Sequence, residues 1–140
     1  MTSPDRQAAI EAVLTAWNQG DFSHLGDHLT ADSTRTSPPS FDSDAGSLEE
    51  LKEVIRDFRT QFPDAHVALR DRTDMGDVSI SHWTFTGTNT GPGDFPPTGR
   101  SVEVDGLSVN HWKDGKITEE EVYFDTLHFM SQLGLVDAPT

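Results

Sequence analysis

A histidine and several carboxylates gather in the last quarter of this 140-residue chain, at a spacing that suits acid/base chemistry. His111 and Glu120 lie on either side of Asp114-Gly115, a pair that is typical of a tight hairpin turn between strands. If the two strands pair about that turn without a bulge, both side chains share one face of the hairpin. A histidine beside a carboxylate in an apolar cavity can exchange protons near neutral pH. We therefore expect an acid/base pair here, while a wet sheet edge without chemistry is the competing interpretation.

The same register predicts which side chains of the hairpin line the cavity. Pairing of Lys113 with Lys116 continues along both strands. It places four apolar residues on the inner face with His111 and Glu120, and we expect them to contact a substrate: Leu107, Val109, Val122 and Phe124. A one-residue bulge would exchange the two faces of the hairpin.

Other residues are candidates for the same site. His82 lies on a strongly β-branched and aromatic run and is a further candidate acid or base. Trp83 and Phe85 form either core or the aromatic wall of a pocket, to which we add Trp17 from the first helix. Asp125 follows the hairpin where a terminal helix begins, so it is either a catalytic carboxylate or the N-cap of that helix.

The composition argues against several classes of function. A net charge of -14 repels nucleic acid and anionic membranes, and we expect neither as a partner. The sequence contains no cysteine, so it has no thiolate metal site and no cysteine nucleophile. His24 and His28 have a metal-compatible spacing but lack a third ligand, and we expect no metal. No membrane span or signal segment is recognisable, which favours a cytoplasmic protein.

Capping residues and breakers indicate the helices that must position these groups. A helix is expected to begin at Ser3-Pro4-Asp5, and a second, short helix to begin with Asp21 as its cap. Residues 31–46 have the composition of a loop, and Pro38-Pro39 excludes helix there. Ser47 opens a capping box for an amphipathic helix that ends before Pro63.

From Ala65 onward the sequence period changes from that of helices to that of strands. The expected strands run from Ala65 to a turn at 74–77, and then over 78–88, 101–112 and 116–124. The segment 91–99 is rich in glycine and proline and is expected to form a lid or rim over the cavity, or else a plain connector. Helices followed by antiparallel strands indicate an α+β fold, and the lack of repeats and linkers indicates a single domain, 1–140.

Six segments carry a resemblance to a known family through their order and spacing. They are Phe62-Pro63-Asp64, Trp83-Thr84-Phe85-Thr86-Gly87-Thr88, Pro97-Thr98-Gly99-Arg100, Asp114-Gly115-Lys116-Ile117, Asp125-Thr126-Leu127 and Gln132-Leu133-Gly134. Together they resemble the SnoaL-like polyketide cyclases, also called the ester cyclase family, over most of the chain from Phe62 onward. The resemblance implies a cone-shaped fold of the nuclear-transport-factor-2 and ketosteroid-isomerase type, with a curved antiparallel sheet wrapped around amino-terminal helices and a deep apolar pocket. It also implies an apolar small-molecule substrate and a homodimer.

Members of that family close the last ring of aromatic polyketides by an intramolecular aldol reaction that needs neither metal nor cofactor. The resemblance places the family's catalytic aspartate on Val122 and its histidine on Ser108, so neither group is present here. Asn89 stands where the family usually has a histidine after Gly-Thr, and we include Ser108 and Asn89 among the expected substrate contacts. The candidate replacements for the missing acid/base groups are Glu120, His111 and His82.

The residues and the resemblance leave three functions open. The first is a cofactor-independent cyclase or isomerase of a polyketide-like or other apolar metabolite, which closes a ring by aldol-type or epoxide-opening chemistry. The second is a non-catalytic module for small-molecule binding or dimerisation, which the missing aldol pair favours. The third is a hydroxylase that works with a separate reductase.

Overall fold

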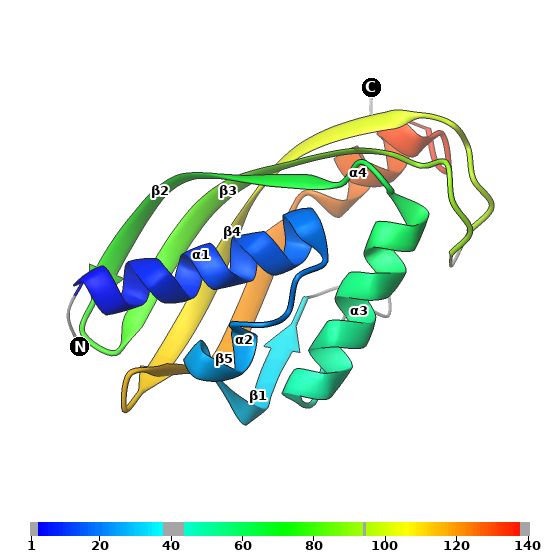
Figure 1. Cartoon of the computed structure of the whole chain (residues 1–140). Helices are drawn as coiled ribbons and strands as arrows, with labels where there is room; N and C mark the ends of the chain where they lie inside the picture. Colours follow the sequence, from blue (N-terminus) through cyan, green and yellow to red (C-terminus); the bar gives the residue numbers. More distant parts are fainter. Residues whose placement is uncertain (1–2, 38–43, 94, 138–140) are drawn as a thin grey trace.

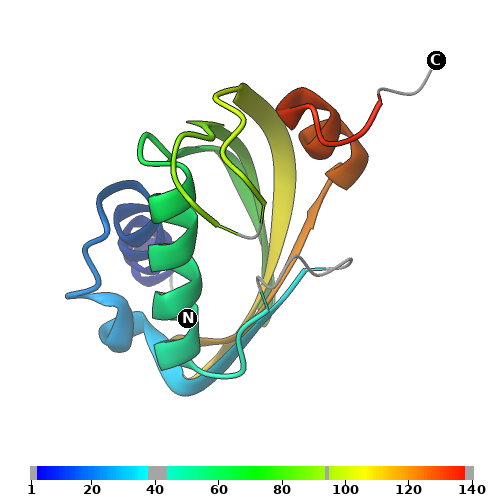
Figure 2. The ribbon, with the colours of Figure 1, turned by 90° about the vertical axis from the view of Figure 1, so that its right-hand side faces the viewer.

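A curved, mostly antiparallel sheet and the helices packed on it make up the fold. The computed structural model describes residues 3–37, 44–93 and 95–137, with side chains from Asp5 onward. The described elements are α1 (Ser3–Gln19), α2 (Leu25–His28), β1 (Leu29–Thr36), α3 (Leu48–Gln61), β2 (His66–Met75), β3 (Val78–Thr88), β4 (Ser101–Lys113), β5 (Lys116–Phe124) and α4 (Thr126–Leu133). The strands form one sheet in the order β1-β5-β4-β3-β2. Figures 1 and 2 show α1 and α3 on the same side of this sheet, which confirms the expected α+β fold.

Local sequence signals fix several boundaries. The Ser47 hydroxyl accepts a hydrogen bond of 3.2 Å from the backbone N–H of Glu50, as a capping box requires. The residues of the Asp114-Gly115 turn both have positive φ, of 52° and 83°. Asp21 does not cap α2, contrary to expectation, because its carboxylate accepts hydrogen bonds within its own turn. None of the described helices is long and apolar enough to cross a membrane.

Strand β1 occupies part of the segment 31–46, where the sequence predicts a loop. It lies at the edge of the sheet, parallel to β5, and its Arg35 is the direct partner of Glu120. Its inward positions include Ser33 and Arg35, which are buried but polar, so no apolar alternation marks the segment as a strand. Pro38-Pro39 lies outside the described residues.

A one-residue bulge in β5 changes the register of the β4–β5 hairpin. Trp112 pairs with Ile117 as expected, but the next pair joins His111 to Glu119 and leaves Thr118 as the extra residue. Beyond this bulge the inner and outer faces of β4 are therefore the reverse of those predicted. The faces of β5 beyond the bulge agree with the prediction.

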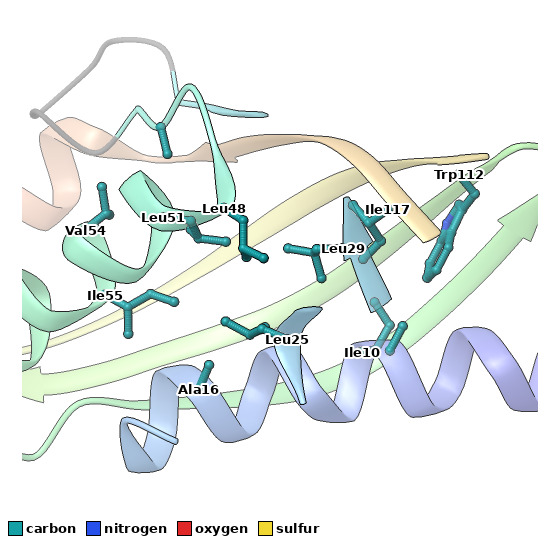
Figure 3. Close-up of a cluster of buried hydrophobic side chains, with 12 residues drawn as sticks. Ile10, Ala16, Leu25, Leu29, Leu48, Leu51, Val54, Ile55, Trp112 and Ile117 are labelled. Carbon is teal, nitrogen blue, oxygen red and sulfur yellow. The ribbon is translucent and has the colours of Figure 1, made fainter. Parts of the chain in front are cut away.

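Two apolar clusters hold the helices against the sheet. The first joins the three amino-terminal helices to β1 and the hairpin tip, and Figure 3 shows Ile10, Leu25 and Ile117 among its side chains. The second joins the end of α3 to the middle of the sheet and to α4 through residues such as Phe62 and Phe129. Side chains from both clusters also line the cavity between them.

Candidate active site

An apolar cavity of about 370 Å³ lies between α1, α3 and the concave face of the sheet. Its apolar side chains are Val13, Trp17, Val54, Phe58, Phe62, Val67, Trp83, Phe85, Pro92, Phe95, Val104, Val122, Phe124 and Phe129. Its polar side chains are Arg35, Asp57, Thr60, Gln61, Ser108 and Glu120. A mostly apolar cavity with a few polar groups is the usual form of a small-molecule site.

The tryptophan in the cavity wall depends on a glycine in the neighbouring strand. Trp83 and Gly106 are cross-strand partners, and a Cβ atom on Gly106 would lie 2.5 Å from Trp83 Cζ2. Glycine is therefore required for the indole to lie across β4. In this position Trp83 Nε1 donates a hydrogen bond of 2.9 Å to Ser108 Oγ, so that the indole and the hydroxyl hold each other in place.

A buried ion pair forms the charged part of the cavity wall. Arg35 Nε lies 3.3 Å from Glu120 Oε1, and the two side chains are only 9% and 16% exposed. The guanidinium carbon of Arg35 lies 5.4 Å from the ring centroid of Trp17, which helps to hold the cation against the wall. Because Arg35 comes from β1 and Glu120 from β5, the pair forms only when the edge strand is in place.

Burial dominates the electrostatics of this pair. It raises the pKa of Glu120 above its ordinary value, while the Arg35 charge and hydrogen bonds from Arg35 and Ser108 act in the opposite direction. Burial also lowers the pKa of Arg35, although a guanidinium stays protonated throughout the physiological range. A carboxyl with a raised pKa beside a fixed positive charge can accept and return a proton, as acid/base catalysis requires.

The cavity and its carboxyl group occur in a fold whose relatives are known. The family model of the SnoaL-like polyketide cyclases matches residues 7–133. The chain belongs to this family. The resemblance recognised in the sequence is thereby confirmed, and family membership supports a cyclase or isomerase role.

Several solved structures superpose on nearly the whole chain. TsrD from Streptomyces laurentii has a TM-score of 0.86 and 26% identity, covering 97% of this chain and 99% of that chain. IdmH from Streptomyces antibioticus, a candidate polyketide cyclase, has a TM-score of 0.76 and 25% identity, covering 95% and 99%. AclR from Streptomyces galilaeus, a candidate hydroxylase, has a TM-score of 0.80 but 21% identity over 99% and 87%, which shows the fold alone. Curated proteins give no match.

The bulge in β5 places three predicted site residues outside the SnoaL-like cavity. His111, Leu107 and Val109 are expected on the inner face from an unbulged register, but they lie on the outer face of β4. Leu107 is 42% exposed there. His82 is the cross-strand partner of Leu107 and shares that outer face, where its Nδ1 lies 3.6 Å from Asp71. Neither histidine can therefore reach a molecule in the cavity.

On the outer face, His111 pairs with Glu121 and not with Glu120. His111 Nε2 lies 2.8 Å from Glu121 Oε1, and Tyr123 donates a hydrogen bond of 2.7 Å to Glu121 Oε2. These hydrogen bonds, that of Tyr123 first, lower the pKa of Glu121. One polar atom from each of His111, Glu119 and Glu121 lies within 4.8 Å of the other two, and this partly exposed group lies outside the cavity.

Asp125 and Asn89 stabilise local structure outside the cavity. The Asp125 carboxylate accepts a hydrogen bond of 3.0 Å from the backbone N–H of His128, so it is the N-cap of α4. Asn89 is fully buried in the β3–β4 connection. Its amide nitrogen donates to Thr98 Oγ1 at 3.3 Å, which braces that connection. Neither residue lines the cavity, so the substrate contact expected for Asn89 is wrong.

The other predicted side chains do lie on the cavity wall. They are Trp17, Trp83, Phe85, Ser108, Glu120, Val122 and Phe124. Ser108 and Val122 are also cross-strand partners, so the positions that the resemblance assigns to the SnoaL-like aldol pair face each other inside the cavity. In this chain those two positions carry a hydroxyl and an isopropyl group, and the Glu120 carboxyl lies two residues before Val122 along β5.

Two polar residues of the site are not found by the sequence analysis. Arg35 lies in the segment expected to be a loop, and no pattern in the neighbouring residues indicates that it belongs to a site. Gln61 ends α3, and its Nε2 has no hydrogen-bond partner in the described part of the chain. Its position three residues after Phe58, on the apolar stripe of the helix, is the signal that could have identified it. The backbone N–H of Gly91 donates a hydrogen bond of 3.1 Å to the Gln61 carbonyl, and the neighbouring Pro92, Gly93 and Phe95 line the cavity beside the end of α3.

Proposed function

We propose that this SnoaL-like protein is a cyclase or isomerase of a polyketide-like or other apolar metabolite, with Glu120 as its acid/base group. The buried Arg35–Glu120 pair in the wall of an apolar cavity of about 370 Å³ is the observation that supports the proposal. The aromatic side chains around the cavity suit a substrate with a planar, apolar body.

The proposed reaction begins with proton removal beside a carbonyl group. Ionised Glu120 takes the proton from the carbon next to the carbonyl, and the electrons of the broken C–H bond form an enolate. The Arg35 guanidinium stabilises the negative charge on the enolate oxygen. In ring closure, the enolate carbon attacks a second carbonyl of the same molecule and Glu120 returns its proton to the new alkoxide. In isomerisation, Glu120 returns the proton to another carbon.

The same carboxyl also suits an epoxide-opening ring closure. In that reaction protonated Glu120 gives its proton to the epoxide oxygen while a hydroxyl of the same molecule attacks the epoxide carbon, and the attacking hydroxyl then loses its proton to the carboxylate. The raised pKa of Glu120 makes its protonated form available at a pH where an ordinary glutamate is ionised. Both reactions use one carboxyl group and a shaped apolar wall.

Hydrogen–deuterium exchange on an apolar ketone tests the proton transfer without knowledge of the natural substrate. The probe is 2-tetralone in D₂O, with exchange of its α-hydrogens followed by proton NMR. We expect the wild-type protein to accelerate exchange over buffer and Glu120→Gln to lose the acceleration, since a positioned base contributes about 10²–10⁴-fold. Glu121→Gln is the matched control, because this neighbour lies on the outer face and should retain full exchange. Equal activity of the two variants would refute the assignment of Glu120.

A non-catalytic binding module is the second candidate, and the Ser108–Val122 pair favours it. These cross-strand partners occupy the positions of the family's aldol groups, yet neither side chain titrates. A binding module should bind 2-tetralone, seen as chemical-shift changes at the tryptophan indoles of the cavity, without accelerating exchange in any variant.

The homodimer implied by the resemblance is also a proposal. Leu107 and Tyr123 are 42% and 43% exposed on the outer face of neighbouring strands, which supports association through that face. Sedimentation velocity of the wild type and of Leu107→Glu tests it, since the charged variant should sediment as a monomer.

A further inference from the structure

A second and much smaller void lies beside the Arg35–Glu120 pair. Its volume is about 10 Å³, and its polar lining includes Ser33, Arg35, Asn110 and Glu120. Arg35 and Glu120 line this void as well as the main cavity, so the ion pair stands between the two spaces. The apolar lining of the void, which includes Leu29, belongs to the cluster in Figure 3.

Asn110 brings a buried polar atom to this void. It is 2% exposed and is the cross-strand partner of Glu120 on the inner face. Its Oδ1 atom has no hydrogen-bond partner among the residues that the structure describes. Buried amide oxygens are almost always paired with a protein group or an ordered water, because an unpaired one costs free energy. The void beside Asn110 is the space from which a partner can come.

We propose that one water molecule binds in this void, where it donates one hydrogen bond to Asn110 Oδ1 and the other to the Glu120 carboxylate. The volume matches the lower limit for a single water, and the lining supplies the polar partners that a buried water needs. Asn110 then acts as a positioning residue, because it holds the water that orients the carboxylate. Only this positioning role rests on the proposed function of Glu120.

The position of the proposed water limits the chemistry in which it can take part. The ion pair separates it from the main cavity, so it cannot attack a molecule bound there. It stabilises the ionised form of Glu120 and thus opposes the effect of burial on the pKa. Among the described residues, the other ionisable side chains that line the main cavity with Glu120 are Arg35 from β1 and Asp57 from α3, whereas α1 contributes the uncharged Val13 and Trp17.

A titration of Glu120 tests the role of Asn110. The pKa is measured by carbon NMR on protein labelled at the glutamate carboxyl, with Glu120→Gln identifying the signal. In Asn110→Leu the water loses its acceptor and its space, and we expect the pKa of Glu120 to rise by about one unit. Ser81→Ala is the control, since the Ser81 hydroxyl is also buried and without a partner in the described residues but does not line the void. An unchanged or lower pKa in Asn110→Leu would overturn the proposal.

A crystal structure of the wild-type protein that resolves ordered waters gives an independent test. We expect density within hydrogen-bond distance of both Asn110 Oδ1 and the Glu120 carboxylate, and its absence overturns the proposal even if Asn110→Leu does not fold. Neither test measures turnover. If Glu120→Gln keeps its ketone exchange, the proposed function fails while the water site stands, and a missing water leaves the proposed function intact.

Discussion

Replacement of Arg35 by methionine isolates the contribution of the buried ion pair to stability. The variant keeps Glu120 buried without its cation, so the folded state must hold this carboxyl protonated. In the unfolded chain Glu120 has the ordinary glutamate pKa of 4.5. Relative to that state, keeping Glu120 protonated in the folded variant costs at most about 3.4 kcal/mol at pH 7 and about 0.8 kcal/mol at pH 5. The sign follows from the raised folded pKa: the unfolded chain releases the proton first, so stability is kept at low pH and lost as the pH rises. Arg35→Met should therefore be destabilised far more at pH 7 than at pH 5.

Urea unfolding followed by tryptophan fluorescence measures the free energy of unfolding at both pH values. The double variant Arg35→Met/Glu120→Leu is the matched control, because it removes both charges together. It should recover most of the loss at pH 7, since apolar replacement of a buried ion pair is often neutral or stabilising. Equal losses at the two pH values, or a double variant no more stable than Arg35→Met at pH 7, would refute the reasoning.

Two further substitutions test the geometry of the site. Gly106→Ala should lower the free energy of unfolding by about 2–4 kcal/mol, because the added methyl group overlaps the Trp83 ring and breaks its hydrogen bond. Gly26→Ala, whose added methyl group meets nothing within 4 Å, is the control, and a similar loss there would contradict the steric argument. Asp125→Ala should lower the free energy of unfolding by about 1 kcal/mol, because α4 loses its N-cap. The variant should still accelerate the exchange of 2-tetralone. If the folded variant loses this exchange, Asp125 is again a candidate catalytic residue.

Local chemistry made much of the fold predictable from the sequence. The Ser47 cap and the Asp114-Gly115 turn each depend on a few adjacent residues, and both are formed as expected. Strand β3 is rich in β-branched and aromatic residues, and β5 begins directly after the Asp114-Gly115 turn; the predicted bounds of both strands agree with the structure. The resemblance that the family model confirms was carried by short segments, among them β3, the Asp114-Gly115 turn and the start of the terminal helix.

The errors come from features that depend on residues far apart in the chain. The polar strand β1 is stabilised by pairing with β5 and not by its own apolar pattern, so Arg35 could not be assigned to the site. The bulge at Thr118 shifts the register of β5 so that Asn110, and not His111, shares the inner face with Glu120, and no residue type in the hairpin indicates this bulge. Glu120 was placed correctly on the inner face, whereas its expected partner His111 was not. The carboxyl group of the site could thus be predicted, but its cation could not.

Among the described residues, strand β1 has a neighbouring strand on one side only, apart from an isolated bridge between Arg35 and Ala45. Edge elements open locally at a lower free energy than the centre of a sheet. Each opening of β1 withdraws Arg35 from Glu120 and admits solvent to the carboxylate, which then titrates as an ordinary glutamate. If Glu120 is the acid/base group, the fraction of molecules with an intact site depends on this opening at the sheet edge. Amide hydrogen exchange along β1 should measure how often the strand opens.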